Sequence, residues 1–191
     1  AIALPKEITL SFLPYPEMSP ALARDGLRAG HQIIVHVPME PEGSSDPGPN
    51  ALLTHLGANE NLSRLNWALS RIEGYSGINN HEGSEFTADR AALVPVVEQL
   101  AQRHVFFLDS RTAPDTAVVP LARAFGVPSA GRDIFLDDVQ TADAITAQLV
   151  QAEKMASQQG VVIAIGHPQS ATMDVLAKWT ATVVSRGYEL S

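Results

Sequence analysis

The stretch Gly30-His-Gln-Ile-Ile-Val-His-Val-Pro-Met-Glu-Pro41 decides the fold, because it joins a helix end, an apolar run and a polar exit. Gly30 ends a stretch of helical periodicity at about Ser19–Ala29, as glycine commonly does in an αL cap. Gln32–Val37 is rich in β-branched residues and predicts a buried strand. A helix followed at once by a short apolar strand is the unit expected of a parallel α/β sheet.

The same unit recurs along the chain and predicts a barrel. Seven apolar, β-rich runs are predicted to be strands, at Ile8–Leu13, Gln32–Val37, Tyr75–Asn79, His104–Leu108, Val127–Ala130, Val161–Ile165 and Tyr188–Leu190. Six stretches of helical periodicity separate them, at about Ser19–Ala29, Asn59–Ile72, Ala88–Arg103, Asp115–Phe125, Thr141–Gln159 and Ala171–Arg186. Gly126, Gly160 and Gly187 end three of these helices just before a strand. We therefore predict an α/β fold, a distorted (β/α) barrel of about seven strands that forms a single domain over residues 1–191.

The composition restricts the partners and the chemistry of any site. The net charge is −8 and no run gathers the 13 basic residues, which argues against nucleic acid as a partner. The chain has no cysteine, so a metal site would be built from His, Asp and Glu. No stretch approaches the roughly 20 consecutive apolar residues of a membrane helix, and the N-terminus lacks the pattern of a signal peptide. We expect no transmembrane segment in this chain, and no pattern predicts its oligomeric state.

Three histidines fall at equivalent positions, near the ends of predicted strands. His36 belongs to the second strand exit, His81 to the third and His167 to the sixth. The carboxyl ends of parallel strands share one face, so these imidazoles are predicted to meet at one rim. Neutral His binds Zn²⁺ and an open position activates water, which makes His36 and His81 candidate ligands of a divalent metal, zinc first. His167 is the candidate proton donor to the leaving group, although a structural, hydrogen-bonded histidine is the alternative at each position.

Polar residues follow the other predicted strands. Asp109 and Arg111 follow the fourth strand, where the carboxylate can orient an imidazole and the guanidinium can bind developing negative charge; a buried salt bridge is the alternative. Asn79 and Asn80 either contact a substrate or shape a turn. Tyr15, just beyond the first strand, can stack on a sugar ring.

The one long irregular segment lies between the second strand and the second helix. Residues 38–57 are rich in Pro, Gly and Ser. A segment of that length in a compact domain is usually a lid, a binding loop or disordered. It is therefore a second candidate element of the site.

Six blocks of sequence resemble, in order, the signature blocks of the divergent polysaccharide deacetylase family. They span nearly the whole chain: Phe12-Leu-Pro-Tyr15, Gly30-His-Gln-Ile-Ile-Val-His-Val-Pro-Met-Glu-Pro41, Gly77-Ile-Asn-Asn-His-Glu-Gly-Ser84, Phe106-Phe-Leu-Asp-Ser-Arg-Thr112, Arg132-Asp-Ile-Phe-Leu-Asp137 and Ile163-Ala-Ile-Gly-His-Pro168. The resemblance implies a barrel related to the metal-dependent carbohydrate esterases, which remove acetyl groups with a metal held by Asp and His. It also implies a carbohydrate substrate and a periplasmic or extracytoplasmic location.

Two departures from the wider superfamily's pattern stand out. The metal-binding block there has two histidines four residues apart, whereas here His36 fills the first position and Glu40 the second. His81 is then the replacement ligand, and Gly166-His167 resembles the block that carries the general acid. The superfamily also opens with a strand that ends in two aspartates, and we expect that pair upstream of Ala1. The residues expected to contact the substrate are Tyr15, Glu40, Asn79, Asn80, Ser84, Arg132 and Asp133.

Three functions compete on these grounds. The first is a hydrolase that deacetylates an N- or O-acetylated polysaccharide with metal-activated water. The second is a glycan-binding or envelope scaffold protein on a degenerate barrel, which the glutamate at position 40 and the missing aspartate pair would suit. The third, a metal-dependent phosphoesterase, is the weakest because the chain has no Gly-rich phosphate cradle.

Overall fold

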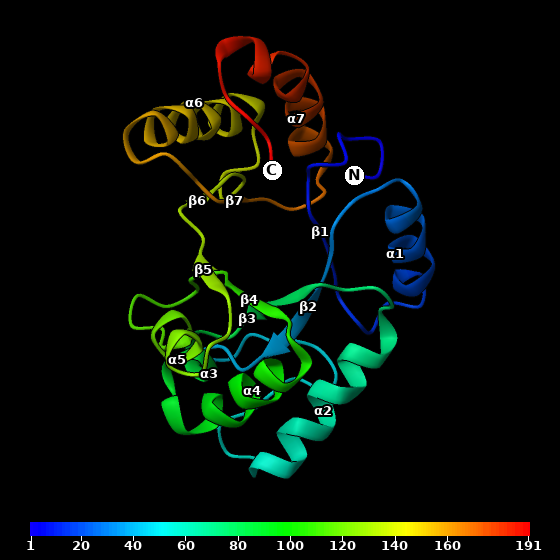
Figure 1. Cartoon of the computed structure of the whole chain (residues 1–191), viewed down its shortest axis with the longest axis vertical. Coiled ribbons are helices and arrows are strands. Elements are labelled where there is room, and N and C mark those ends of the chain that lie inside the picture. Colours follow the sequence, from blue (N-terminus) through cyan, green and yellow to red (C-terminus); the bar gives the residue numbers. More distant parts are fainter. The chain divides into compact units, whose positions relative to one another are not determined.

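The computed structural model describes all of residues 1–191, which form two compact units. The larger unit is Thr9–Gly131, and the smaller one combines Ala1–Ile8 with Arg132–Ser191 (Figure 1). This division into two units does not test the prediction of a single domain, which stays a prediction. None of the helices is both long and apolar enough to span a membrane.

The larger unit is built on a parallel sheet of five strands in the order β1-β2-β3-β4-β5. The strands are β1 (Leu10–Phe12), β2 (Ile33–Met39), β3 (Gly77–Glu82), β4 (Phe106–Asp109) and β5 (Ser129–Gly131). The helices between them are α1 (Ser19–Arg28), α2 (Ala58–Arg71), α3 (Ser84–Ala88), α4 (Arg90–Arg103) and α5 (Val118–Ala124). Strands that follow one another in space as in sequence, joined by right-handed crossovers, put all their helices on one face. The predicted α/β fold with a parallel sheet is confirmed.

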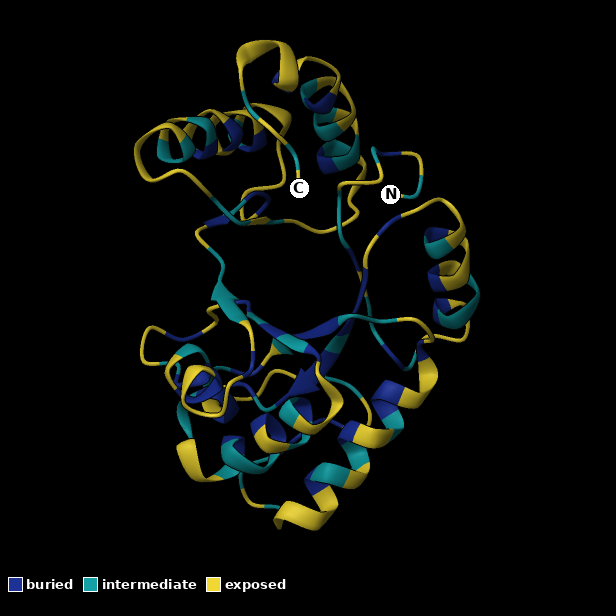
Figure 2. Ribbon diagram, in the orientation of Figure 1, coloured by how far each residue is buried: buried dark blue, intermediate teal, exposed yellow.

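The register of the central strands separates an apolar face from a polar one. Val35 pairs with Ile78, which pairs with Phe107, and all three side chains are fully buried. They form the row beneath α2 and α4, whose buried residues face the sheet while their exposed residues face outward (Figure 2). Each such side chain contributes about 1.5–3 kcal/mol by leaving water. Side chains alternate along a strand, so the neighbouring row, His36 and Asn79, lies on the opposite face.

Strand β2 runs past Pro38, which the sequence analysis took as its end. The carbonyl of Pro38 accepts the N–H of Leu52, and the N–H of Glu40 donates to the carbonyl of Leu52, where β1 has already ended. Proline is tolerated here because its missing N–H would point toward that same side, not toward β3. β3 also continues past Asn79, where it was predicted to end, so His81 lies within a strand, as His36 does.

Local hydrogen bonds explain where the helices of the larger unit begin. Asp89 caps α4 by accepting the N–H groups of Ala91 and Ala92, so that helix starts at Arg90. α5 starts at Val118 and not at Asp115, because the Thr116 hydroxyl accepts the N–H of Val118 and donates to the carboxylate of Asp109. α3 was not predicted.

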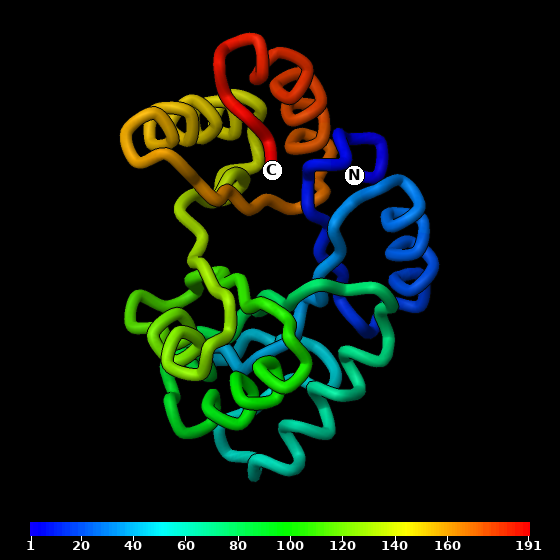
Figure 3. Tube along the Cα trace, in the orientation of Figure 1, coloured from blue at the N-terminus to red at the C-terminus, as the bar shows by residue number.

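The smaller unit packs two helices on a two-stranded parallel sheet. It contains β6 (Ile134–Phe135), β7 (Ala164–Ile165), α6 (Ala142–Gln159), α7 (Ser170–Val183) and the 3₁₀ turn η1 (Val184–Arg186). Its core is formed by five buried residues, Ile134, Leu136, Ile145, Leu149 and Ala152. The chain's first residues lie beside α7 (Figure 3). The strands form one five-stranded and one two-stranded sheet, so the predicted barrel of about seven strands is not confirmed.

The strand predicted at Tyr188–Leu190 is wrong, because this segment is irregular. The Tyr188 hydroxyl lies 2.9 Å from the Ser157 hydroxyl of α6, within hydrogen-bonding distance. Glu153, also on α6, accepts the Trp179 indole N–H at 2.7 Å and an Arg186 N–H at 2.7 Å. Hydrogen bonds to helix side chains therefore hold the C-terminal tail, and no strand pairing is needed.

The Glu153→Gln variant should lose about 1 kcal/mol of stability at pH 7, a value discounted for solvent screening. The hydrogen bond from Arg186 lowers the pKa of Glu153 below its ordinary 4.5, and this outweighs the effect of burial. The stabilisation by the carboxylate is full above the ordinary value and disappears as the pH falls through the folded pKa. The wild type and the variant should therefore converge in stability as the pH falls through the lowered folded pKa of Glu153, which urea unfolding measures.

The fluorescence of Trp179 supplies a second measurement in a Trp67→Phe background. The fluorescence intensity should change with pH as the Glu153 carboxyl takes up a proton in the Trp67→Phe parent. It should not show this change when Glu153→Gln is added. Glu98→Gln, at an exposed position on α4, is the matched control. A stability difference that stays constant from pH 7 to pH 3 would contradict this role of Glu153.

Candidate functional site

Two histidines of the larger unit meet across the sheet. His36 on β2 pairs in register with Asn79, and His81 lies two residues further along β3, on the same face. His36 Nε2 and His81 Nδ1 are 3.1 Å apart, and the rings meet edge to face with centroids 4.8 Å apart. The two imidazoles predicted to be ligands are thus neighbours.

The spacing of these nitrogens is that of a hydrogen bond between the two rings, and it is also close to the separation of two nitrogens bound to one metal ion. Zn–N bonds of about 2.0–2.1 Å at a tetrahedral angle separate two ligand nitrogens by about 3.3 Å. The observed 3.1 Å is close to that value. No group of three His, Asp or Glu side chains gathers around one point, so the chain supplies this pair and not a complete set.

Glu40, which stands where the superfamily pattern has a second histidine, anchors the long loop instead. Its carboxylate accepts the N–H of Thr54 at 2.5 Å and the Thr54 hydroxyl at 2.7 Å, and His55 Nδ1 lies 3.8 Å away. Burial raises the pKa of Glu40, but the hydrogen bonds from Thr54 and the nearby His55 outweigh it and leave the pKa below its ordinary value. The carboxylate is therefore held ionised by the loop.

Residues 41–57 form a wall that buried side chains and hydrogen bonds tie to the rest of the larger unit. Leu52 is fully buried, and the Ser84 hydroxyl accepts the N–H of Glu42 at 2.7 Å. Near the tip, Asp46 accepts the N–H of Gly48, against which the Tyr15 ring packs so closely that a Cβ would lie 2.8 Å from it. Burial, together with Asp46, raises the pKa of the Tyr15 phenol. Tyr15 and Ser84 therefore support this wall, and their predicted contacts with substrate stay predictions.

The two asparagines tie neighbouring strands together. Asn79 accepts the Ser11 hydroxyl at 2.6 Å and donates to the Ser110 hydroxyl at 3.2 Å. Asn80 accepts the N–H of Ser110 at 2.8 Å and donates to the carbonyl of Glu82. Both side chains are buried, which favours the structural alternative, and substrate binding by them stays untested.

Asp109 lies on the opposite side of β4 from the histidine face. Leu108 pairs with Asn79, and because side chains alternate, Asp109 points toward the helices. Its fully buried carboxylate accepts the N–H of Arg111 at 2.8 Å and the Thr116 hydroxyl at 3.0 Å. These bonds shape the loop that leaves β4. Neither supports the prediction that Asp109 orients an imidazole.

The smaller unit holds an aspartate–histidine pair that the sequence analysis only half identified. Asp137 is buried, and its carboxylate accepts the N–H of His167 at 2.6 Å and the Thr172 hydroxyl at 2.8 Å. Its other oxygen lies 3.1 Å from His167 Nδ1, while the imidazole is half-exposed. Donation by Nδ1 to the carboxylate leaves Nε2 as the nitrogen that faces outward and exchanges protons.

Asp137 could have been found from register. Phe135 pairs with Ile165, and Asp137 and His167 each lie two residues further on. Because Asp137 and His167 lie equally far beyond a pair of partnered residues, both lie just past the carboxyl ends of β6 and β7. Asp137 lies within the signature block Arg132–Asp137, in which the sequence predicts site roles for Arg132 and Asp133 only.

Arg132 and Asp133 lie in the same unit as this pair. The Arg132 guanidinium stacks 5.0 Å above the Phe135 ring, which meets the His167 ring edge to face at 5.3 Å. Asp133 accepts the N–H of Ile163 at 2.9 Å and so secures β6 against β7. Arg132 is thus held near the imidazole, whereas Asp133 has a structural bond.

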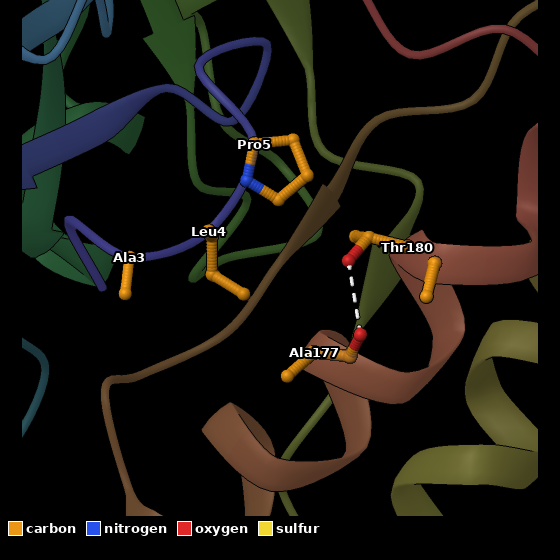
Figure 4. A pocket seen from close by; sticks show the side chains of 6 residues that line it. Ala3, Leu4, Pro5, Ala177 and Thr180 are labelled. Carbon is orange, nitrogen blue, oxygen red and sulfur yellow. Dashed lines mark hydrogen bonds between the residues drawn. The ribbon is translucent and has the colours of Figure 1, made fainter.

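A cavity of the smaller unit is lined by none of these polar residues. It measures about 410 Å³ and is lined by Ala3, Leu4, Pro5, Ala177, Thr180 and Ala181. In Figure 4 the first three come from the N-terminal segment and the others from α7, where the Thr180 hydroxyl donates to the Ala177 carbonyl. Small apolar side chains without convergent polar groups are a poor match to a catalytic pocket.

Comparison with known proteins relates the whole chain to one family. The family model described as Divergent polysaccharide deacetylase matches residues 1–191. The chain is 33% identical over 174 residues to an uncharacterized protein of Haemophilus influenzae and 32% identical over 175 residues to the uncharacterized protein YibQ of Escherichia coli. These matches cover 91% and 92% of this chain, which spans only 62% and 55% of the relatives' lengths.

A solved structure has the same fold. The crystal structure of uncharacterized protein ATU2773 from Agrobacterium tumefaciens C58 matches with a TM-score of 0.95 at 30% identity. The match covers 98% of this chain and 77% of that one. The folds therefore agree over nearly all of the chain.

The Thr54→Val variant should raise the pKa of Glu40 toward its ordinary value. The change removes the hydroxyl donor but keeps the shape and the backbone N–H of residue 54. A ¹³C NMR titration of the glutamate carboxyl carbons measures this pKa directly. Thr146→Val, on the exposed face of α6, is the matched control. An unchanged Glu40 pKa in Thr54→Val would show that the hydroxyl bond has no part in holding the carboxylate ionised.

Proposed function

Because the chain belongs to the divergent polysaccharide deacetylase family, we propose that it is the catalytic part of a hydrolase that deacetylates an N- or O-acetylated polysaccharide with a divalent metal, zinc first. The observation that carries the proposal is the Asp137–His167 pair. A buried carboxylate that orients a half-exposed imidazole is the arrangement that general acid–base catalysis requires.

His36 and His81 are the proposed metal ligands within this chain. Their nitrogens have the spacing of two ligands on one ion, and neutral imidazole is a preferred zinc ligand. When bound, the ion would polarise the acyl carbonyl and acidify a water molecule.

His167 is the proposed general acid. With Nδ1 held by Asp137, Nε2 can carry the proton that the departing amine or alkoxide takes up. The Thr172 hydroxyl donates to the Asp137 carboxylate and keeps it in place beside the imidazole. Arg132, stacked on Phe135, is proposed to contact the glycan beside the imidazole.

The architecture and location are part of the same proposal. Parallel strands in sequential order with their helices on one face suit a (β/α) barrel of about seven strands. The location proposed from the family is periplasmic or otherwise extracytoplasmic, where polysaccharide substrates occur. Cell fractionation of the full-length protein tests it.

A glycan-binding or envelope scaffold protein is the second candidate. The observation that favours it is Glu40, whose carboxylate is bound to Thr54 instead of serving the site. A protein of this kind would bind the polysaccharide without releasing acetate. Acetate release by the full-length protein therefore separates the two candidates.

The Asp137→Asn variant should lower kcat by about 10²-fold or more with a smaller effect on KM. Asparagine keeps the shape but can present an N–H to His167 Nδ1, which favours the wrong tautomer. The measurement is acetate release from acetylated glycans by the full-length protein, with a pH profile. Asp174→Asn, at an exposed position on α7, is the matched control, and equal activity of wild type and Asp137→Asn would count against the general-acid role.

Replacement of either paired histidine should abolish stoichiometric metal binding. We expect about one zinc per full-length wild-type chain, and a large loss in both His36→Ala and His81→Ala, because each removes one of the strongest donors. Elemental analysis after dialysis gives the ratio. His167→Ala should retain the metal while losing activity, whereas zinc retained by His81→Ala would exclude His81 as a ligand.

A further inference from the structure

Arg111 is held in an unusual conformation at the end of β4. Its backbone has φ of 49°, in the left-handed region that residues with side chains seldom adopt. The N–H of Arg111 donates to the buried carboxylate of Asp109, which is itself fixed by the Thr116 hydroxyl. A strained residue that its surroundings keep in place is a common mark of a functional site.

Gly131 explains where the side chain of Arg111 goes. Gly131 is the last residue of β5 and pairs in register with Asp109. A Cβ placed on Gly131 would meet the guanidinium of Arg111 first, with Cζ and Nη2 each 2.9 Å away. The φ of Gly131 is not positive, so its backbone does not require glycine. The lack of a side chain matters here because it gives the guanidinium room at the end of the strand.

We propose that Gly131 is a positioning residue, whose lack of a side chain lets the guanidinium of the exposed residue Arg111 lie over the carboxyl end of β5 as a binding site for a carboxylate. A guanidinium presents a planar fork of N–H donors that matches the two oxygens of a carboxylate. The carboxyl ends of parallel strands are where such ligands bind in α/β sheets. A guanidinium fixed against the backbone loses less entropy on binding than a mobile one.

The source of the carboxylate rests on the proposed function. Deacetylation releases acetate, and polysaccharides also contain acidic sugars. The two sources share the same planar group, so acetate and glucuronate are the probes. Tighter binding of glucuronate would assign the site to an acidic sugar of the substrate, and tighter binding of acetate would assign it to the product.

The test is NMR of the arginine Nε–Hε groups in this chain, with Arg111→Lys to assign the Arg111 signal. In the wild type that signal should be resolved and should shift as acetate or glucuronate is added. Gly131→Ala should fold normally, because the atoms that must move belong to the end of a flexible side chain. It should return the Arg111 signal to the group of mobile arginines and weaken binding about tenfold.

A double-mutant cycle separates positioning from a general effect on the sheet. Gly131→Ala should weaken binding by as much as Arg111→Ala, and should add nothing in the Arg111→Ala background. Gly57→Ala, where φ is ordinary and no atom lies within 4 Å of the new Cβ, is the matched glycine control. Additive losses, or a wild-type Arg111 signal that neither probe shifts, would overturn the inference. Binding without acetate release from any glycan would overturn only the proposed function.

Discussion

The register of β2, β3 and β4 is the constraint on which the larger unit depends. Val35, Ile78 and Phe107 must share one row, because only then can α2 and α4 cover three large apolar side chains at once. Moving any strand by one residue would turn its apolar side chains to the other face. The same alternation puts His36 and Asn79 opposite the helices. The core thus fixes the meeting of His36 and His81 before any hydrogen bond between them is considered.

The smaller unit obeys the same rule on two short strands. Only Ile134 and Phe135 pair with Ala164 and Ile165, yet this is enough to align the residues that follow. Asp137 is buried in a position that would be costly for an unpaired carboxylate, and three donors satisfy it. The imidazole is therefore oriented by a group whose own place is fixed, which is what a proton donor of constant geometry needs.

The sequence predicted the order of strands and helices well because apolar periodicity and glycine stops are local signals. It failed where a tertiary contact decided the outcome. Pro38 can lie within β2 because the pairing of β2 with β1 has already ended at that point. Tyr188 does not form a strand, because its hydroxyl lies within hydrogen-bonding distance of Ser157 on α6. His36 and His81 could be paired from strand positions alone. Asp137 was missed because its role follows from the pairing of β6 with β7, which was not predicted.

The departures from the superfamily's pattern have a physical logic of their own. A glutamate at position 40 cannot replace an imidazole while both its oxygens lie within reach of Thr54 and His55, and the hydrogen bonds that lower its pKa are those that hold the loop. Glu40 therefore stabilises the wall, and β3 carries His81 to the same face as His36. The ligand role proposed for His81 requires no change in the sheet, because the parallel register of β2 and β3 already brings His81 beside His36.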